Sequence, residues 1–276
     1  MSPATTESKT IMGQDNMVSH TEDLKCDGAA GIAVVIGATG AFGRVIASKL
    51  LGRGLDVLAV ARNTGALEAL QQELPGIRIC CADVSSGEST ELIARALTGP
   101  VRAVVHGPGV GVAGGILDAD IEILNEAVNI KVGGLLRVVR ATESHMSKGS
   151  RIIAIGGHYG LEPTAYAASA GVANAALVNV VRQLSLGYGP RGITAHVVAP
   201  GPAETERLRA VAIARAEQGG MSVQQVLDQM LSESSISQFT TPEQVAWAVS
   251  LLLDEEADAM TGSTLMLDSG RRRGLP

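Results

Sequence analysis

The sequence predicts an α/β fold in which one doubly wound parallel sheet lies between two layers of helices, in a single domain. Short runs of Val, Ile, Leu and Ala alternate along the chain with segments whose apolar residues recur at helical spacing. A continuous apolar run is typical of a strand buried on both faces of a parallel sheet, and strand–helix alternation is typical of a doubly wound sheet. Neither a linker nor an internal repeat interrupts the 276 residues.

Seven strands follow from these patterns. They are expected at Ile32–Ile36, Asp56–Ala61, Ile77–Ala82, Val101–His106, Arg151–Ile155, Ile193–Val198 and Thr264–Leu267. Helices are expected from about Val45 to Leu51 and at Gly65–Leu74, Glu91–Leu97, Ile121–Glu143, Tyr166–Leu186 and Pro242–Leu253. The segment Met1–Ala30 is polar and lacks apolar periodicity, so we expect a disordered or loosely attached extension before a domain that spans residues 31–276.

Composition narrows the range of partners. The net charge of −6 gives no broad attraction to nucleic acid or anionic lipid, and no apolar run reaches the length of a membrane span. Cys26, Cys80 and Cys81 have no metal-ligand spacing, so we expect reduced thiols in a cytoplasmic protein and no metal site. The run Arg271–Arg273 is expected to be a solvated tail.

A glycine-rich turn follows the first strand. Gly37, Gly40 and Gly43 recur at three-residue spacing and lead into a helical pattern; the same turn contains Thr39, Ala41 and Phe42. Glycine lets the backbone turn sharply and approach a phosphate, while the free N–H groups that open the helix attract its charge. The turn therefore predicts a dinucleotide phosphate site; tight packing of strand on helix is the alternative.

Further fragments appear in the order found in one family. They are Asp83-Val84, Asn129, Tyr166-Ala167-Ala168-Ser169, Gly189-Pro190-Arg191-Gly192-Ile193, Pro200-Gly201-Pro202 with Thr205, Thr241-Pro242-Glu243 and Thr261-Gly262. Over about residues 31–270 the chain resembles the short-chain dehydrogenase/reductase family. The resemblance implies a Rossmann fold and a nicotinamide dinucleotide held by the glycine turn and by Asp83, Val84, Gly107, Pro108, Tyr166, Pro200, Gly201 and Thr205.

The end of the second strand indicates which dinucleotide binds. An acidic residue about twenty positions beyond the glycines normally holds the ribose 2′-hydroxyl of NAD, but here Ala61 is followed by Arg62 and Asn63. No acid repels a 2′-phosphate, and an arginine pairs with one through charge-assisted hydrogen bonds. We therefore expect NADP(H), bound by Arg62 with help from Arg44; an ordinary surface arginine is the alternative. Asp83 is expected to accept from the adenine amino group, or else to cap a turn.

The expected catalytic set is incomplete. The family uses a Ser, a Tyr, a Lys four residues beyond the Tyr, and an Asn. Tyr166 and Asn129 match the Tyr and the Asn, but the Ser position falls on Gly157 and the Lys position on Ala170. Because a free tyrosine ionises only near pH ~10, Tyr166 needs another source of positive charge to act as an acid or base at neutral pH.

Three nearby residues are candidates for the missing groups. His158 is next to the vacated Ser position, and its side chain titrates near neutral pH; an ordinary loop histidine is the alternative. Lys131 follows Asn129 by two residues, an offset that points elsewhere on an α-helix, so we expect a solvated lysine. His106 ends the fourth strand, where it either approaches the cofactor or bonds loop backbone.

Residues 204–240 occupy the place of the family's substrate lid. Their apolar spacing predicts two amphipathic helices separated by Gly219 and Gly220, with an aliphatic inner face that suits a small, largely apolar molecule. The alternative is a permanently docked helical pair. We expect a homotetramer or homodimer that assembles through the helices at Ile121–Glu143 and Tyr166–Leu186, the second of which is rich in alanine.

Three functions remain open. The first is an NADP(H)-dependent oxidoreductase acting on a small carbonyl or alcohol with altered acid–base groups. The second is a non-redox enzyme, such as a cyclase, isomerase or lyase, and the third is a catalytically silent NADP(H)-binding protein. Because the hydride comes from the cofactor, losing Ser and Lys impairs proton transfer without removing the redox chemistry, and the retained Tyr166 and Asn129 favour the first.

Overall fold

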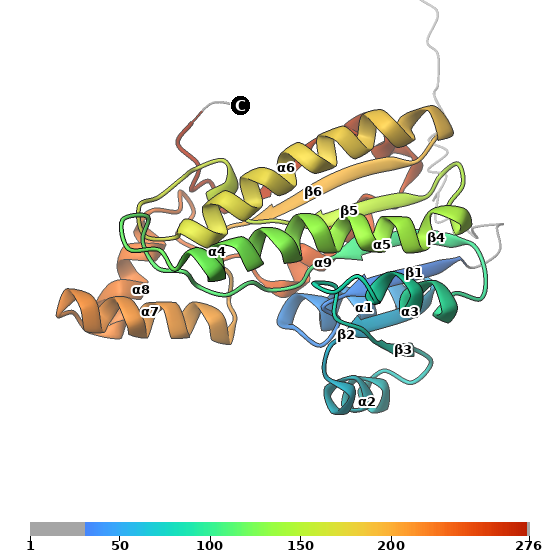
Figure 1. Ribbon diagram of the computed structural model, residues 1–276. Helices are drawn as coiled ribbons and strands as arrows, with labels where there is room; N and C mark the ends of the chain where they lie inside the picture. Colours follow the sequence, from blue (N-terminus) through green and yellow to red (C-terminus); the bar gives the residue numbers. More distant parts are fainter. Residues whose placement is uncertain (1–30, 275–276) are drawn as a thin grey trace, which may run out of the picture.

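The computed structural model describes residues 31–274. The predicted extension Met1–Ala30 lies outside the described residues. Seven parallel strands form one sheet in the order β3-β2-β1-β4-β5-β6-β7 (Figure 1). The strands are β1 (Ile32–Ile36), β2 (Asp56–Ala61), β3 (Arg78–Cys81), β4 (Val101–His106), β5 (Arg151–Ile155), β6 (Thr194–Pro200) and β7 (Thr264–Leu267). The predicted doubly wound α/β class is confirmed.

Helices cover both faces of the sheet (Figure 1). One face is covered by α1 (Ala41–Gly52), α2 (Thr64–Glu73) and α9 (Pro242–Leu251). The other is covered by α3 (Ser89–Ala96), α4 (Ile121–Val128), α5 (Gly134–Thr142) and α6 (Ala168–Tyr188). Short 3₁₀ segments lie at Glu143–His145, His158–Gly160, Gly189–Arg191 and Glu255–Met260.

The central strands are apolar throughout because both of their faces are buried. In β1, Ile32, Val34 and Ile36 belong to the core under α3, α5 and α6. The alternate residues Ala33 and Val35 belong to the core under α1, α2 and α9. Each strand residue thus contributes to one of two cores, as the continuous apolar pattern predicts.

The predicted helix Ile121–Glu143 is interrupted. A π-helical turn, Asn129–Gly133, separates α4 from α5. A π turn bonds each N–H to a carbonyl five residues back instead of four, so it rotates the residues that follow relative to an α-helical register. This interruption determines where the side chain of Lys131 points.

Residues 204–240 contain the predicted pair of helices, α7 (Glu206–Gly219) and α8 (Val223–Ser232). They extend beyond the carboxyl ends of the strands (Figure 1). Their aliphatic side chains form a small core of their own, with Ala212 and Ala216 from α7 against Val226 and Met230 from α8. Gly220 ends α7 in a left-handed conformation, with φ of 61°, which favours glycine.

The prediction of a solvated C-terminal tail is wrong for Arg271. Its side chain is buried, donates to the carbonyl of Met230 at 2.9 Å and pairs with Glu233 at the end of α8. Arg272 lies 3.6 Å from Glu162, while Arg273 is exposed. A guanidinium has five donors, so it can bond several backbone and carboxylate oxygens that an apolar side chain leaves unpaired. The tail therefore fixes α8 to the body.

None of the helices in residues 31–274 is long and apolar enough to cross a membrane.

Candidate active site

The glycine turn meets the loop after β4 where the strand order reverses. Gly37 has φ of 77°, and a Cβ there would lie 3.0 Å from the Cα of Pro108 and 3.1 Å from the carbonyl of Gly107. A Cβ on Gly43 would collide with the carbonyl oxygen of Gly37. Only glycine fits these two positions. In doubly wound sheets the crevice outside such a reversal is where nucleotides bind.

The first turn of α1 is open to an anion. Its N-cap residue, Gly40, has no side chain to accept a hydrogen bond from the helix N–H groups, and both Gly40 and Ala41 are exposed. Thr39 is half-buried beside them, and Phe42 packs on the core beneath α1. Unpaired N–H groups at a helix start carry partial positive charge, so this end of α1 fits a phosphate.

Arg62 is exposed at the end of β2, and among residues 31–274 no hydrogen bond or ion pair engages its guanidinium. Its neighbour Asn63 caps α2 by accepting the N–H of Ala66 at 2.9 Å. Arg44 pairs with Glu73 at the end of α2. Of the two arginines expected at a 2′-phosphate, Arg62 is therefore the one whose charge is not already neutralised.

The other expected cofactor contacts also have structural roles. Asp83 accepts the N–H of Ser85 at 3.0 Å and so stabilises the turn after β3, as its alternative interpretation predicts. Val84 is buried in the core. Pro200 ends β6, and a Cβ on Gly201 would approach the Cα of Asp268 to 2.9 Å.

Thr205 caps α7, because its hydroxyl accepts the N–H of Leu208 at 3.4 Å. None of these structural roles prevents contact with a dinucleotide, and none by itself indicates one.

Tyr166 lies at the outer rim of the site, two residues before α6 begins. Its hydroxyl is 2.9 Å from that of Tyr159, and the guanidinium of Arg215 on α7 lies 3.8 Å from its ring centroid. Burial alone raises the pKa of Tyr166, but the hydrogen bond with Tyr159 and the charge of Arg215 outweigh burial and lower it. Burial and the same hydrogen bond raise the pKa of Tyr159.

Gly157 faces Asn174 rather than Tyr166. A Cβ on Gly157 would lie 2.9 Å from the side-chain nitrogen of Asn174, which is one turn of α6 beyond Ala170. Asn174 is buried, and its side-chain oxygen has no hydrogen-bond partner within the described residues. The vacated Ser position is thus occupied by an amide from α6, and Tyr166 contacts a different set of residues.

The prediction of a solvated Lys131 is wrong. The π-helical turn directs this side chain inward, where it is 6% exposed and donates to the carbonyl of Ile155 at the end of β5, at 2.7 Å. Burial, and to a lesser extent the charge of Arg207, lower the pKa of Lys131 to about 8. A cation therefore lies at the carboxyl end of the sheet, where it bonds the end of β5 and its charge acts on His106 at the end of β4.

The two candidate histidines are buried and neutral at pH 7. His106 places its Nε2 3.0 Å from the carbonyl of Ile130, as its alternative interpretation predicts, and burial lowers its pKa to about 3. His158 stacks on Tyr159 with ring centroids 3.9 Å apart, and burial lowers its pKa to about 4. Its Nε2 has no partner in residues 31–274. Neither ring holds a proton at pH 7 that it can readily donate as imidazolium.

Asn129 opens the π-helical turn. Its amide donates to the carbonyl of Ser85 and to Glu126, both at 3.1 Å, and its oxygen accepts from Arg137 at 2.9 Å. The side chain is thus engaged with the loop after β3. These bonds anchor the turn that directs Lys131 into the site.

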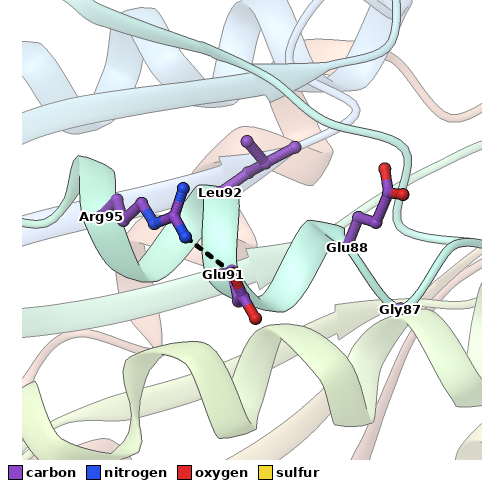
Figure 2. Close-up of a pocket in the computed structure, with 5 residues that line it drawn as sticks. All are labelled: Gly87, Glu88, Glu91, Leu92 and Arg95. Atoms are coloured by element: carbon purple, nitrogen blue, oxygen red, sulfur yellow. Dashed lines mark hydrogen bonds and ion pairs between the residues drawn. The ribbon is translucent and has the colours of Figure 1, made fainter.

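Two surface hollows lie away from Tyr166, and the second is partly lined by Thr205, one of the expected cofactor residues. The first, of about 370 Å³, lies over α3 and is lined by Gly87, Glu88, Glu91, Leu92 and Arg95 (Figure 2). Glu91 and Arg95 form an exposed ion pair there at 2.8 Å. The second, of about 400 Å³, lies between α7 and α8 and is lined by Glu204, Thr205, Leu208, Arg209, Val223, Gln224, Leu227 and Phe239. Neither hollow includes Tyr166 or Gly157. The candidate site is therefore described by the contacts among its side chains and not by a cavity.

Three functional candidates were missed from the sequence: Tyr159, Asn174 and Arg215. Tyr159 had a signal, because two of the three tyrosines in the chain lie seven residues apart in this segment. Asn174 was detectable as a polar residue on the small-residue helix. Arg215 had no signal, since its role depends on how α7 folds over Tyr166.

A parallel sheet with an open glycine turn at its strand-order reversal defines the class of Rossmann-fold nucleotide-binding proteins. A family model described as enoyl-(acyl carrier protein) reductase matches residues 37–272. The chain belongs to the short-chain dehydrogenase/reductase family, as its motifs predict.

Curated relatives agree with this assignment. The chain is 29% identical over 245 residues to the 3-oxoacyl-(acyl-carrier-protein) reductase FabG of Escherichia coli strain K12, covering 87% of this chain and 96% of the relative. It is 27% identical over 283 residues to the reductase MabA of Mycobacterium avium, covering 98% and 96%.

Solved structures share the fold. YwfH, titled an NADPH dependent reductase involved in bacilysin biosynthesis, aligns with a TM-score of 0.81 at 21% identity, covering 90% of this chain and all of that one. An NADPH-bound short chain oxidoreductase from Pseudomonas aeruginosa PAO1, titled as containing an atypical catalytic center, aligns with a TM-score of 0.77 at 21% identity, covering 89% and 98%.

Proposed function

We propose that this protein is an NADP(H)-dependent oxidoreductase that acts on a small, largely apolar carbonyl or alcohol with altered acid–base groups. The observation that carries the proposal is that one chain has both an intact dinucleotide site and a tyrosine whose phenol lies beside a cation. The dinucleotide site has the two positions where only glycine fits, the open start of α1, and Arg62, whose guanidinium has no partner within residues 31–274. Tyr166 has Arg215 over its ring.

The residues that would hold the dinucleotide fit its chemistry. The turn Gly37–Gly43 and the start of α1 would hold the pyrophosphate, and Arg62 would hold the 2′-phosphate. When bound, NADP(H) supplies or accepts the hydride. YwfH is an NADPH dependent reductase and the Pseudomonas aeruginosa oxidoreductase was solved with NADPH bound, and the arginine at the end of β2 supports the same cofactor here.

The protein then has to move one proton to or from the substrate oxygen. Tyr166 is the proposed acid–base group, because its environment favours the phenolate more than water does. Lys131 provides a second positive charge deeper in the site. His158 and Asn129 remain further candidates, as a neutral ring beside Tyr159 and as the anchor of the π-helical turn.

The apolar character of the substrate is supported by the loop between β4 and α4. This loop contacts α6 through Ser169 and α7 through Arg207, so it borders the rim on which Tyr166 lies. Its side chains Val112, Ile116 and Leu117 are exposed. Exposed apolar side chains beside a site suit an apolar ligand. The aliphatic residues of α7 and α8 support this less directly, because several of them pack on one another.

Cofactor binding tests the proposal first. NADPH should bind more tightly than NADH, and Arg62→Ala should weaken NADPH by roughly 10- to 100-fold, the usual value of charged hydrogen bonds, while leaving NADH nearly unchanged. Calorimetric titration of both cofactors into both proteins measures this. A wild-type preference for NADH, or a preference that survives the substitution, would overturn the cofactor assignment.

A further inference from the structure

Two side chains from two separate segments converge on the Tyr166 phenol. Arg215 comes from the middle of α7, with its guanidinium carbon 3.8 Å from the ring centroid. Tyr159 comes from the 3₁₀ turn after β5, with its hydroxyl 2.9 Å from that of Tyr166. The two tyrosine rings meet edge to face at 5.7 Å and 89°. The phenol thus has a cation over its face and a hydroxyl at its oxygen.

Both contacts favour the ionised phenol. A cation over an aromatic face is attracted to the electrons of the ring, and the attraction grows when the ring carries a full negative charge. A hydroxyl that donates to the charged oxygen stabilises it further, whereas hydrogen bonds to the neutral form would oppose ionisation.

The remaining groups near this pair do not cancel the effect. The hydroxyl of Thr164 lies close enough to accept the backbone N–H of Tyr166, and it also favours the phenolate. Arg271 from the C-terminal tail adds positive charge on the Tyr159 side. Within residues 31–274, the side chains that shift the pKa of Tyr166 are Tyr159, Arg215 and Thr164, and none of them is a carboxylate.

We propose that Arg215 and Tyr159 together replace the missing family lysine, so that the helical lid supplies the positive charge that ionises Tyr166. Arg215 is then a positioning residue that acts through the phenol. The inference that Tyr166 ionises does not depend on the proposed function. Only the use of the phenolate in proton transfer to or from a substrate rests on it. It also links proton transfer to the lid, because lifting α7 removes the cation. A second arginine on the same helix, Arg207, donates to the carbonyl of Val110 at 2.9 Å and holds α7 in place.

The chain allows a direct test by titration. It has three tyrosines, so tyrosinate absorbance in the near ultraviolet can be assigned with Tyr166→Phe, Tyr159→Phe and Tyr188→Phe. In wild type the first tyrosine to ionise should be Tyr166. Arg215→Gln should raise that midpoint by roughly one to three pH units, the usual effect of removing a nearby opposite charge. Arg215→Lys should retain part of the shift.

Controls separate this effect from general loosening of the lid. Arg209→Gln removes an exposed arginine from the same helix and should leave the midpoint in place. Arg191→Gln removes the cation 5.4 Å from the Tyr188 ring and should move only that tyrosine. Tyr159→Phe should raise the Tyr166 midpoint, because the donated hydrogen bond is lost.

The outcomes distinguish the two claims. An unchanged Tyr166 midpoint in Arg215→Gln, or an equal rise in Arg209→Gln, overturns the inference whatever the enzyme does. A midpoint that moves as expected supports it even when no carbonyl is turned over. In that case the proposed reductase function is wrong, while the inference that Arg215 and Tyr159 promote ionisation of Tyr166 is supported.

Discussion

The ammonium group of Lys131 donates a hydrogen bond to the carbonyl oxygen of Ile155, 2.7 Å away at the carboxyl end of β5. This relationship exists because the π-helical turn Asn129–Gly133 directs the side chain inward. It places a buried cation beside the predicted cofactor crevice of a chain that lacks the family lysine.

The buried amine makes stability depend on pH. The pKa of Lys131 falls from its ordinary value to about 8, so the unfolded chain binds more protons than the folded one between pH 8 and the ordinary lysine pKa. Stability from this group therefore rises with pH across that window. Relative to Lys131→Met, the free energy of unfolding of the wild type should rise by about 3 kcal/mol across this pH window. Urea unfolding at a series of pH values measures the difference, and a difference that stays flat or falls would contradict the assignment.

Gly157 tests the amide that fills the family's Ser position. Gly157→Ser adds a hydroxyl beside Asn174, whose side-chain oxygen is buried without a partner in the described chain. Gly157→Ala adds the same Cβ without a donor. The serine variant should be the more stable of the two by about 1 kcal/mol, the net value of one hydrogen bond. Thermal unfolding of both variants measures this, and equal stability would show that the serine hydroxyl does not satisfy Asn174.

The C-terminal tail should stabilise the lid. Arg271→Met leaves the carbonyl of Met230 and the carboxylate of Glu233 without their donor, at a cost of about 1–3 kcal/mol. Arg273→Met, at an exposed position, is the matched control. Proteolysis within α7 and α8 should quicken in the first variant only. Equal rates would mean that the tail does not hold these helices.

Assembly remains a prediction. Ile121 on α4 and Leu186 on α6 are 69% and 68% exposed, which leaves apolar surface on the two long helices expected to associate. Light scattering at micromolar concentration should give the mass of a dimer or tetramer, and Leu186→Lys should shift it toward the monomer. A monomeric wild type would contradict the prediction.

Local patterns predicted most of the fold because each strand carries its own signal. Asp56–Ala61, Val101–His106, Arg151–Ile155 and Thr264–Leu267 were predicted with the bounds that the structure shows. The glycine turn was equally predictable from the sequence, because its spacing is a local motif. Gly43 is required by the backbone of its own turn, since a Cβ there would collide with the carbonyl oxygen of Gly37. Gly37 has a positive φ and also needs space beside Gly107 and Pro108, which are distant in sequence.

The candidate site was harder to predict from the sequence because its contacts join residues that are far apart along the chain. Nothing near Arg215 in the sequence says that its helix folds over Tyr166, which lies 49 residues earlier by numbering. The burial of Lys131 cannot be predicted from its offset from Asn129, because that offset points outward on an ideal α-helix and the structure has a π turn there. Arg271 was misjudged because three adjacent arginines at a chain end have no local sign of burial.

Carbonyl-dependent oxidation of NADPH tests the central claim most directly. With a panel of small apolar ketones at pH 7, the wild type should oxidise NADPH, and Tyr166→Phe should lower kcat by on the order of 10²–10⁴-fold, the usual contribution of a positioned acid–base group. His158→Ala should retain most of the rate, since a ring with a pKa of about 4 is not protonated at pH 7. A wild type that binds NADPH yet oxidises none with any carbonyl, or a Tyr166→Phe variant as active as wild type, would contradict the account.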